Sequence, residues 1–188
     1  MPPKETRTFR SQAVVLRHLE YGEADRILTL FTLERGKIQA MAKGVRKIHS
    51  RKAGHLEPFT QVALFLAKGR NMAVITQAEA MRTFPGIRAD LKLTGYAAYV
   101  IELLDRFTYE EGENRQLYNL LVETLERLDT SPFPTTVAHY YEVHLLDLLG
   151  YRPELTQCAA CHKKIEPVDQ YFSPKLGGAL CPQCGGQD

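Results

Sequence analysis

The chain has 188 residues, of which 44% are apolar and 24% are charged, and its formal net charge is +2. This composition is typical of a globular protein and excludes a disordered polyelectrolyte. No apolar run approaches the roughly 18 residues of a membrane-spanning helix, and the first residues lack the apolar stretch of a secretory signal. We therefore expect a soluble protein of the cytoplasm that has no membrane partner.

The charge is unequally divided along the chain. Residues 1–80 contain 14 Lys and Arg against 7 Asp and Glu, a net charge of +7, whereas residues 81–188 carry −5. A basic half of this kind favours an anionic partner, of which nucleic acid is the commonest. The alternative is a solvated basic face with no partner.

The first 80 residues have the pattern of short strands separated by turns. Apolar and β-branched runs predict strands at 13–19, 26–32, 37–43, 61–67 and 72–80. In the third run, alternation places Ile38, Ala40 and Ala42 on one face. It places Lys37 and Lys43 on the other face, towards solvent or a ligand. Five strands with the longest connection between the third and the fourth predict a small closed barrel of the OB type.

The connection between the third and fourth predicted strands is strongly basic. Residues 43–55 contain five Lys and Arg and two His. Together with the preceding strand they predict a DNA-binding surface made by Lys37, Lys43, Arg46, Lys47, Arg51 and Lys52. The segment has no aromatic residue, and Phe31, Phe59 and Phe65 could equally belong to the core. We therefore expect binding that is dominated by phosphates and tolerant of sequence, with a salt dependence typical of roughly six contacts.

From residue 88 onward the apolar period becomes helical. Three stripes, over 93–107, 117–128 and 137–149, predict three helices whose apolar faces form a bundle core. An exposed groove between such helices could instead hold a partner peptide. Pro and Gly at 83–86 interrupt both periods. We expect an α+β chain with an OB-fold nucleic-acid-binding domain at 1–82, a helical domain at 83–155 and a zinc-binding motif at 156–188.

All four cysteines of the chain lie in two C-x2-C pairs, and they are Cys158, Cys161, Cys181 and Cys184. Each pair can place two thiolates on one ion, and two pairs supply the tetrahedral S4 shell that zinc prefers. We expect one structural Zn²⁺. Disulfides or unmetallated thiols are the alternatives, and a cytoplasmic setting disfavours disulfides.

The sequence gives little support to an enzyme. A closed S4 shell leaves no coordination position for water, so the predicted metal is structural. His18-Leu19-Glu20 matches the H-x-E of zinc deaminases, but it falls in a predicted strand and Cys181 follows leucine where those enzymes have proline. The common phosphate-loop, dinucleotide and hydrolase motifs are absent. We therefore expect a protein that is not an enzyme.

Three features in this order carry a resemblance to a known family: the segment 43–59 with its Lys43-Gly44-Val45-Arg46-Lys47 start, the segment Leu148-Leu149-Gly150-Tyr151-Arg152-Pro153, and the paired cysteines. Over essentially its whole length the sequence resembles the RecO family of bacterial recombination mediators. The resemblance implies an OB fold, a helical domain with an inserted zinc motif, and binding of single- and double-stranded DNA. It also implies strand annealing, partnership with RecR, contact with single-stranded-DNA-binding protein, and help in loading the recombinase during repair. Members of that family usually continue into a further helix, whereas this sequence stops at Asp188.

A second hypothesis belongs to a different class of function. In it, the acidic helical half is the working surface of a zinc-stapled protein–protein adaptor that does not bind nucleic acid directly. The charge of −5 and the apolar stripes motivate it. The two roles are compatible in one molecule.

Overall fold

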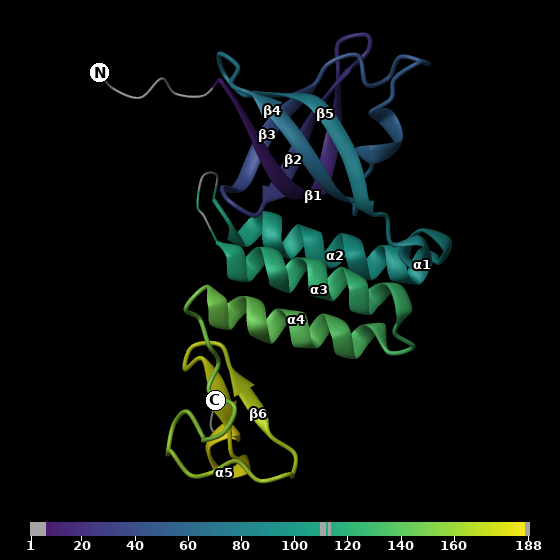
Figure 1. Cartoon of the computed structure of the whole chain (residues 1–188). Helices are drawn as coiled ribbons and strands as arrows, with labels where there is room; N and C mark the ends of the chain where they lie inside the picture. Colours follow the sequence, from purple (N-terminus) through teal and green to yellow (C-terminus); the bar gives the residue numbers. More distant parts are fainter. Residues whose placement is uncertain (1–6, 110–111, 113, 187–188) are drawn as a thin grey trace, which may run out of the picture. The chain divides into compact units, whose positions relative to one another are not determined.

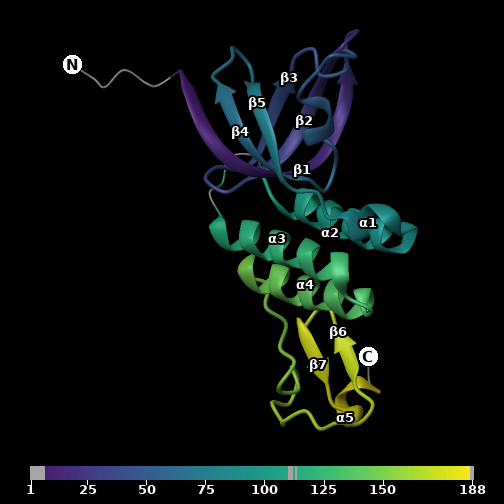
Figure 2. The same cartoon turned by 45° about the vertical axis from the view of Figure 1, so that its right-hand side comes forward.

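The structure is a computed structural model, and it describes residues 7–109, 112 and 114–186. The chain divides into two compact units, with the boundary after Ala138. The first contains a five-stranded barrel and three of the helices that follow it (Figures 1 and 2). The second contains most of the last long helix and the paired cysteines. Within the described part of the chain, no helix is both long and apolar enough to cross a membrane.

Five strands close into a barrel in the order β1-β2-β3-β5-β4. They are β1 (Thr8–Tyr21), β2 (Asp25–Thr32), β3 (Gly36–Ala42), β4 (Gln61–Ala67) and β5 (Ala73–Arg82). Neighbouring strands are antiparallel except β3 and β5, which pair in parallel at Ala40–Ala73 and Met41–Val74. All five predicted strands are confirmed. β1 begins earlier than predicted because its first half pairs with β4 as well.

The barrel core follows the alternation that the sequence predicts. Ala40 and Ala42 are fully buried, and Ile38 packs against them. Strands β1, β2, β4 and β5 contribute Ala13, Val15, Leu28, Leu30, Val62, Leu64, Leu66 and Ile75 to the same core. A register shift between Val15 and Arg17 interrupts the β1–β2 pairing. Such an irregularity bends a strand, which allows the long β1 to pair with β2 along one part and with β4 along the other.

The helices that follow are α1 (Pro85–Ala89), α2 (Leu91–Phe107), α3 (Arg115–Thr130) and α4 (Pro134–Leu148). The Asp90 carboxylate caps α2 by accepting from the N–H groups of Lys92 and Leu93, and the Asn114 side chain caps α3. The apolar residues of the stripe predicted at 117–128 all lie buried on α3, and they are Leu117, Leu120, Leu121, Leu125 and Leu128. In α4, Tyr141 and Leu145 are buried but Tyr140 is 41% exposed, so the third stripe is narrower than predicted.

Helices α1, α2 and α3 pack against one another across one end of the barrel (Figures 1 and 2). Polar contacts join the two layers. Arg17 on β1 and Lys37 on β3 both pair with Asp105 on α2, and Gln61 on β4 donates to the Tyr118 hydroxyl on α3 at 3.1 Å. The barrel and these helices therefore form one compact unit.

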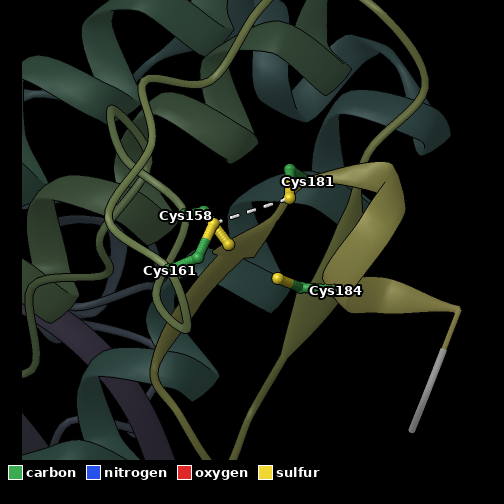
Figure 3. Close-up of side chains that lie close together, drawn as sticks. All are labelled: Cys158, Cys161, Cys181 and Cys184. Carbon is green, nitrogen blue, oxygen red and sulfur yellow. Dashed lines mark hydrogen bonds between the residues drawn. The ribbon is translucent and has the colours of Figure 1, made fainter.

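After α4, the second unit contains a small hairpin and one helical turn. Strand β6 (Tyr171–Ser173) pairs antiparallel with β7 (Gly178–Leu180), and α5 (Pro182–Gly185) follows. The sequence did not predict this hairpin, because strands of three residues are too short to show a period. The hairpin lies between the two cysteine pairs in the chain and brings the second pair back towards the first (Figure 3).

Candidate nucleic-acid interface and metal centre

The basic loop, residues 43–55, is fixed to the barrel near both of its ends. Val45 is 1% exposed, and Leu56, which follows the loop, is fully buried; both belong to the barrel core. Gly44 has a φ of +62°, and its N–H donates to the Asp25 carboxylate at 2.7 Å. The N–H of Arg46 donates to the Ala24 carbonyl at 2.9 Å. The loop therefore lies against the β1–β2 turn, and it exposes several residues between its anchors, among them Arg46, Lys47 and Arg51.

Four of the six predicted cations are exposed in the loop, and they are Lys43, Arg46, Lys47 and Arg51. Arg46 pairs with Glu20 at 3.2 Å. Exposed pairs of this kind stabilise a fold by about 0 to 1 kcal/mol, so a phosphate can replace the Glu20 carboxylate at small cost. The other three have no ion-pair partner among the residues that the structure describes. These four side chains offer a cluster of fixed positive charge.

The geometry argues against the phosphate role predicted for Lys37. Its Nζ donates to the Asp105 carboxylate at 3.0 Å and to the Asp105 carbonyl at 2.6 Å, and its side chain is 12% exposed. Arg17 reaches the same carboxylate at 3.1 Å. Partial burial raises the pKa of Asp105, but the hydrogen bonds from Lys37 and Arg17 outweigh that effect and lower the pKa. Lys37 therefore joins the barrel to α2, and binding a phosphate would require it to leave Asp105.

Lys52 also uses its ammonium group in hydrogen bonds within the fold. Its Nζ donates to the carbonyls of Lys43 and Ile75, both at 3.1 Å, so it ties the loop to β5. Burial lowers the pKa of Lys52, and the nearby Asp25 carboxylate partly opposes this effect. We therefore assign Lys52 a positioning role within the loop.

The four cysteines come together in the second unit. Their Sγ atoms all lie within 4.8 Å of one another, and none of the four forms a disulfide (Figure 3). The Sγ atoms of Cys161 and Cys181, which belong to different pairs, are 3.8 Å apart. This arrangement brings together the four ligands predicted from the spacing.

Backbone hydrogen bonds shape each cysteine pair into a tight turn. The N–H of His162 donates to the Cys158 carbonyl at 2.8 Å, and the N–H of Cys158 donates to the Lys163 carbonyl at 2.7 Å. In the second pair, the N–H of Cys184 donates to the Cys181 carbonyl at 3.0 Å. Both turns direct their thiols towards the same point, as a shared metal ion requires.

The electrostatics of the cluster suit a cation. Hydrogen bonds from the backbone N–H groups of Cys161 and Cys181 lower the pKa of Cys158 to about 6. Hydrogen bonding with the thiols of Cys181 and Cys161 raises the pKa of Cys184, because a second thiolate would lie beside the first. The Cys158 thiolate therefore forms readily, and a neighbouring positive ion would favour ionisation of Cys184 beside it. Four sulfur ligands within 4.8 Å of one another are compatible with the S4 shell that Zn²⁺ prefers.

The fold and the cluster together define a class: a protein with a five-stranded barrel, a basic loop, a helical extension and a four-thiol centre of the structural metal type. Comparison with known families extends this description. The family model described as Recombination protein O N terminal matches residues 6–84, and the one described as Recombination protein O C terminal matches residues 88–188.

Curated relatives agree with the two family models. A DNA repair protein RecO of Roseiflexus sp. (strain RS-1) is 44% identical over 182 residues, which cover 97% of this chain and 64% of the relative. DNA repair protein RecO of Dehalococcoides mccartyi (strain ATCC BAA-2266 / KCTC 15142 / 195) is 43% identical over 94% of this chain and 70% of its own length. The chain belongs to the RecO family of DNA repair proteins, and it spans about two thirds of the length of these relatives. The family descriptions name no catalysed reaction, in agreement with the prediction that the protein is not an enzyme.

Proposed function

We propose that this chain is a recombination mediator that binds single- and double-stranded DNA in the cytoplasm, promotes annealing of complementary strands and assists recombinase loading. RecR and single-stranded-DNA-binding protein are its proposed partners. The observation that carries the DNA-binding proposal is the exposed charge of Lys43, Arg46, Lys47 and Arg51 on a loop with buried anchors. The membership of a DNA repair family supports it.

The proposed mechanism is neutralisation of phosphates by a loop that is already ordered. Val45 and Leu56 anchor the two ends of the loop in the barrel core. Because the loop is already ordered, little conformational entropy is lost when its exposed cations contact the DNA backbone. Contacts to phosphates carry no sequence information, so binding is tolerant of sequence. Two complementary strands repel each other through their phosphates, and a cation cluster that screens this repulsion favours their pairing.

We infer that the barrel is of the OB type. Its closed order β1-β2-β3-β5-β4 and the long connection between β3 and β4 support this assignment. The three predicted domains at 1–82, 83–155 and 156–188 remain our proposal for the functional division of the chain. The end of β5 at Arg82 and the start of α1 at Pro85 agree with the first boundary.

We propose that Cys158, Cys161, Cys181 and Cys184 hold one structural Zn²⁺. The ion would supply the positive charge that lets all four thiols ionise together. The surroundings of the cysteines support a structural role, because Cys158, Leu180 and Cys181 form a small buried cluster of their own. A unit with so little apolar core gains much of its stability from such a metal.

The direct test is replacement of all four exposed loop cations in the Lys43→Ala, Arg46→Ala, Lys47→Ala, Arg51→Ala variant. We expect it to lose at least tenfold in affinity for a labelled oligonucleotide at moderate salt, measured by fluorescence anisotropy. A control with the same loss of charge replaces Lys92, Arg106, Arg152 and Lys175, all exposed outside the loop. Equal affinities for the loop variant, the control and the unmodified chain would contradict the proposal.

One observation favours an adaptor function in addition to the proposed DNA binding. A hollow of about 400 Å³ on α2 is lined by Lys92, Gly95, Tyr96 and Tyr99, and aromatic surfaces of this kind are common where peptides dock. The loop variant separates the two functions. If the loop variant loses DNA binding but still binds purified RecR or single-stranded-DNA-binding protein with unchanged affinity, the protein contacts use a surface other than the basic loop. Loss of DNA and protein binding together would contradict a separate adaptor surface.

A further inference from the structure

The barrel carries an aromatic side chain in a hollow on its outer surface. The hollow has a volume of about 770 Å³, within the range of about 300 to 1,000 Å³ that is usual for small-ligand sites. Strands β1, β4 and β5 form its floor, and the end of the basic loop forms one wall through Arg51 and His55. Phe65 on β4 is the aromatic residue that lines it.

The strand register explains why Phe65 points outward. Its neighbours Leu64 and Leu66 belong to the barrel core, so alternation places the Phe65 ring on the exterior, where it is half-buried. Phe65 pairs with Arg10 of β1 on one side and with Gln77 of β5 on the other. The next outward residue of β4 is alanine, Ala63, whose small side chain leaves space beside the ring.

The charges in the hollow indicate what it can accept. Two cations, Arg10 and Arg51, and two carboxylates, Glu34 and Glu79, line the hollow, so these side chains offer no net positive charge to a phosphate. Gln12 and Gln77 add hydrogen-bond donors and acceptors around the Phe65 ring. An uncharged, flat, hydrogen-bonding group fits this lining better than an anion does. A nucleobase is such a group.

Arg10 lies beside the Phe65 ring, and Arg51 links the hollow to the basic loop. The Arg10 guanidinium lies 5.8 Å from the centre of the Phe65 ring, within the range of a cation–π interaction. Arg51 is one of the four exposed loop cations and also lines the hollow. A DNA backbone held by the loop at Arg51 would therefore lie beside the hollow.

We propose that this hollow is a stacking subsite for one unpaired base of single-stranded DNA, with the base on Phe65 and its backbone beside Arg51. The subsite rests on the proposed DNA-binding function and adds to it a preference for unpaired nucleotides. A base within a duplex is stacked between its neighbours and cannot reach Phe65 without leaving the helix. The loop cations bind both forms of DNA, whereas Phe65 favours the single strand.

The absence of tryptophan from the chain allows a direct test. A Phe65→Trp variant introduces a single indole, and its fluorescence should be quenched when an oligothymidylate binds. A strand of abasic sites with the same number of phosphates should bind through the loop and leave the fluorescence unchanged. The matched control is Phe172→Trp, which replaces an exposed phenylalanine on β6 and should show no quenching with either strand.

A second variant tests how much the Phe65 ring contributes to the affinity for single-stranded DNA. Phe65→Ala should lose roughly tenfold in affinity for single strands and less than about twofold for a duplex, with no change in the salt slope, because stacking releases no counterions. Binding of oligothymidylate without quenching of Phe65→Trp, or equal losses for single strand and duplex in Phe65→Ala, would overturn the subsite alone. No DNA binding by the unmodified chain would overturn the proposed function and the subsite with it.

Discussion

Lys37 and Asp105 join the barrel to the helices through a pair of contacts. The Lys37 Nζ on β3 donates to both the carboxylate and the backbone carbonyl of Asp105 near the end of α2, at 3.0 and 2.6 Å. Because the lysine is 12% exposed, this ammonium group belongs to the interior of the first unit. Lys37 therefore holds the fold, in contrast to the four exposed cations of the basic loop, for which we propose contact with DNA.

The first prediction concerns this pair. Asp105→Asn should lower the free energy of unfolding at neutral pH by about 1 kcal/mol, a modest value because Asp105 is partly exposed. Since the pKa of Asp105 is lowered in the folded state, its contribution is full above the ordinary pKa of 3.8 and is lost as the pH falls through the lowered value. Urea unfolding at pH 7 and pH 3 should show a smaller difference for the variant than for the unmodified chain. An identical pH dependence would contradict the assignment.

The second prediction compares two lysines of the basic loop. Lys47→Ala should weaken DNA binding and reduce the magnitude of the salt slope by about 0.7 on single strands, because one phosphate contact is lost. Lys52→Ala should change the slope little and should instead speed hydrogen exchange of the loop, because Lys52 bonds the carbonyls of Lys43 and Ile75. Equal changes in slope for both variants would show that Lys52 also contacts phosphate.

The third prediction concerns the close packing of Gly185 in the second unit. A Cβ atom at this position would overlap the ring of Tyr171, so the hairpin or the second cysteine pair must move. At Gly186 the nearest atom to an added Cβ is the Pro182 carbonyl oxygen at 3.7 Å, an ordinary contact. Gly185→Ala should therefore weaken metal binding at least tenfold, measured by competition with a chromophoric chelator. Gly186→Ala is the matched control, and similar affinities for both variants would contradict the packing.

The fourth prediction concerns removal of the metal. The protein should contain one zinc per chain, and a strong chelator should increase hydrogen exchange across residues 154–186. Oligonucleotide affinity should remain within about twofold, because the loop anchors Val45 and Leu56 lie in the barrel core. Complete loss of DNA binding on chelation would show that the barrel surface and the metal centre do not act independently.

Local pattern was sufficient to predict the five strands of the barrel, the helices α2, α3 and α4, and the cysteine cluster. Alternation in β3 predicted the burial of Ala40 and Ala42, and the C-x2-C spacing predicted that Cys158 and Cys184 would share a centre. These features depend on residues that are near in sequence or on ligand chemistry. The family resemblance noted from the loop and the cysteines is confirmed by both family models.

Features set by distant parts of the chain could not be predicted in the same way. Alternation correctly placed Lys37 outside the barrel core, but nothing near it in the sequence indicates that Asp105, 68 residues later, covers that side. Phe31 and Phe65 were equivalent candidates for the core. The structure buries Phe31 to 1% exposure and places Phe65 in the outer hollow, a difference that depends on strand register and on the neighbours Arg10 and Ala63.

The most direct test of DNA binding is the salt dependence of single-strand affinity for the intact chain. With Lys37 and Lys52 engaged in the fold, four exposed cations remain on the loop, so log affinity should fall with log salt at a slope of about −3. Fluorescence anisotropy with a labelled oligothymidylate at several salt concentrations measures this slope. A slope near zero, or no binding at the lowest salt concentration, would contradict the assignment of the basic loop to DNA phosphates.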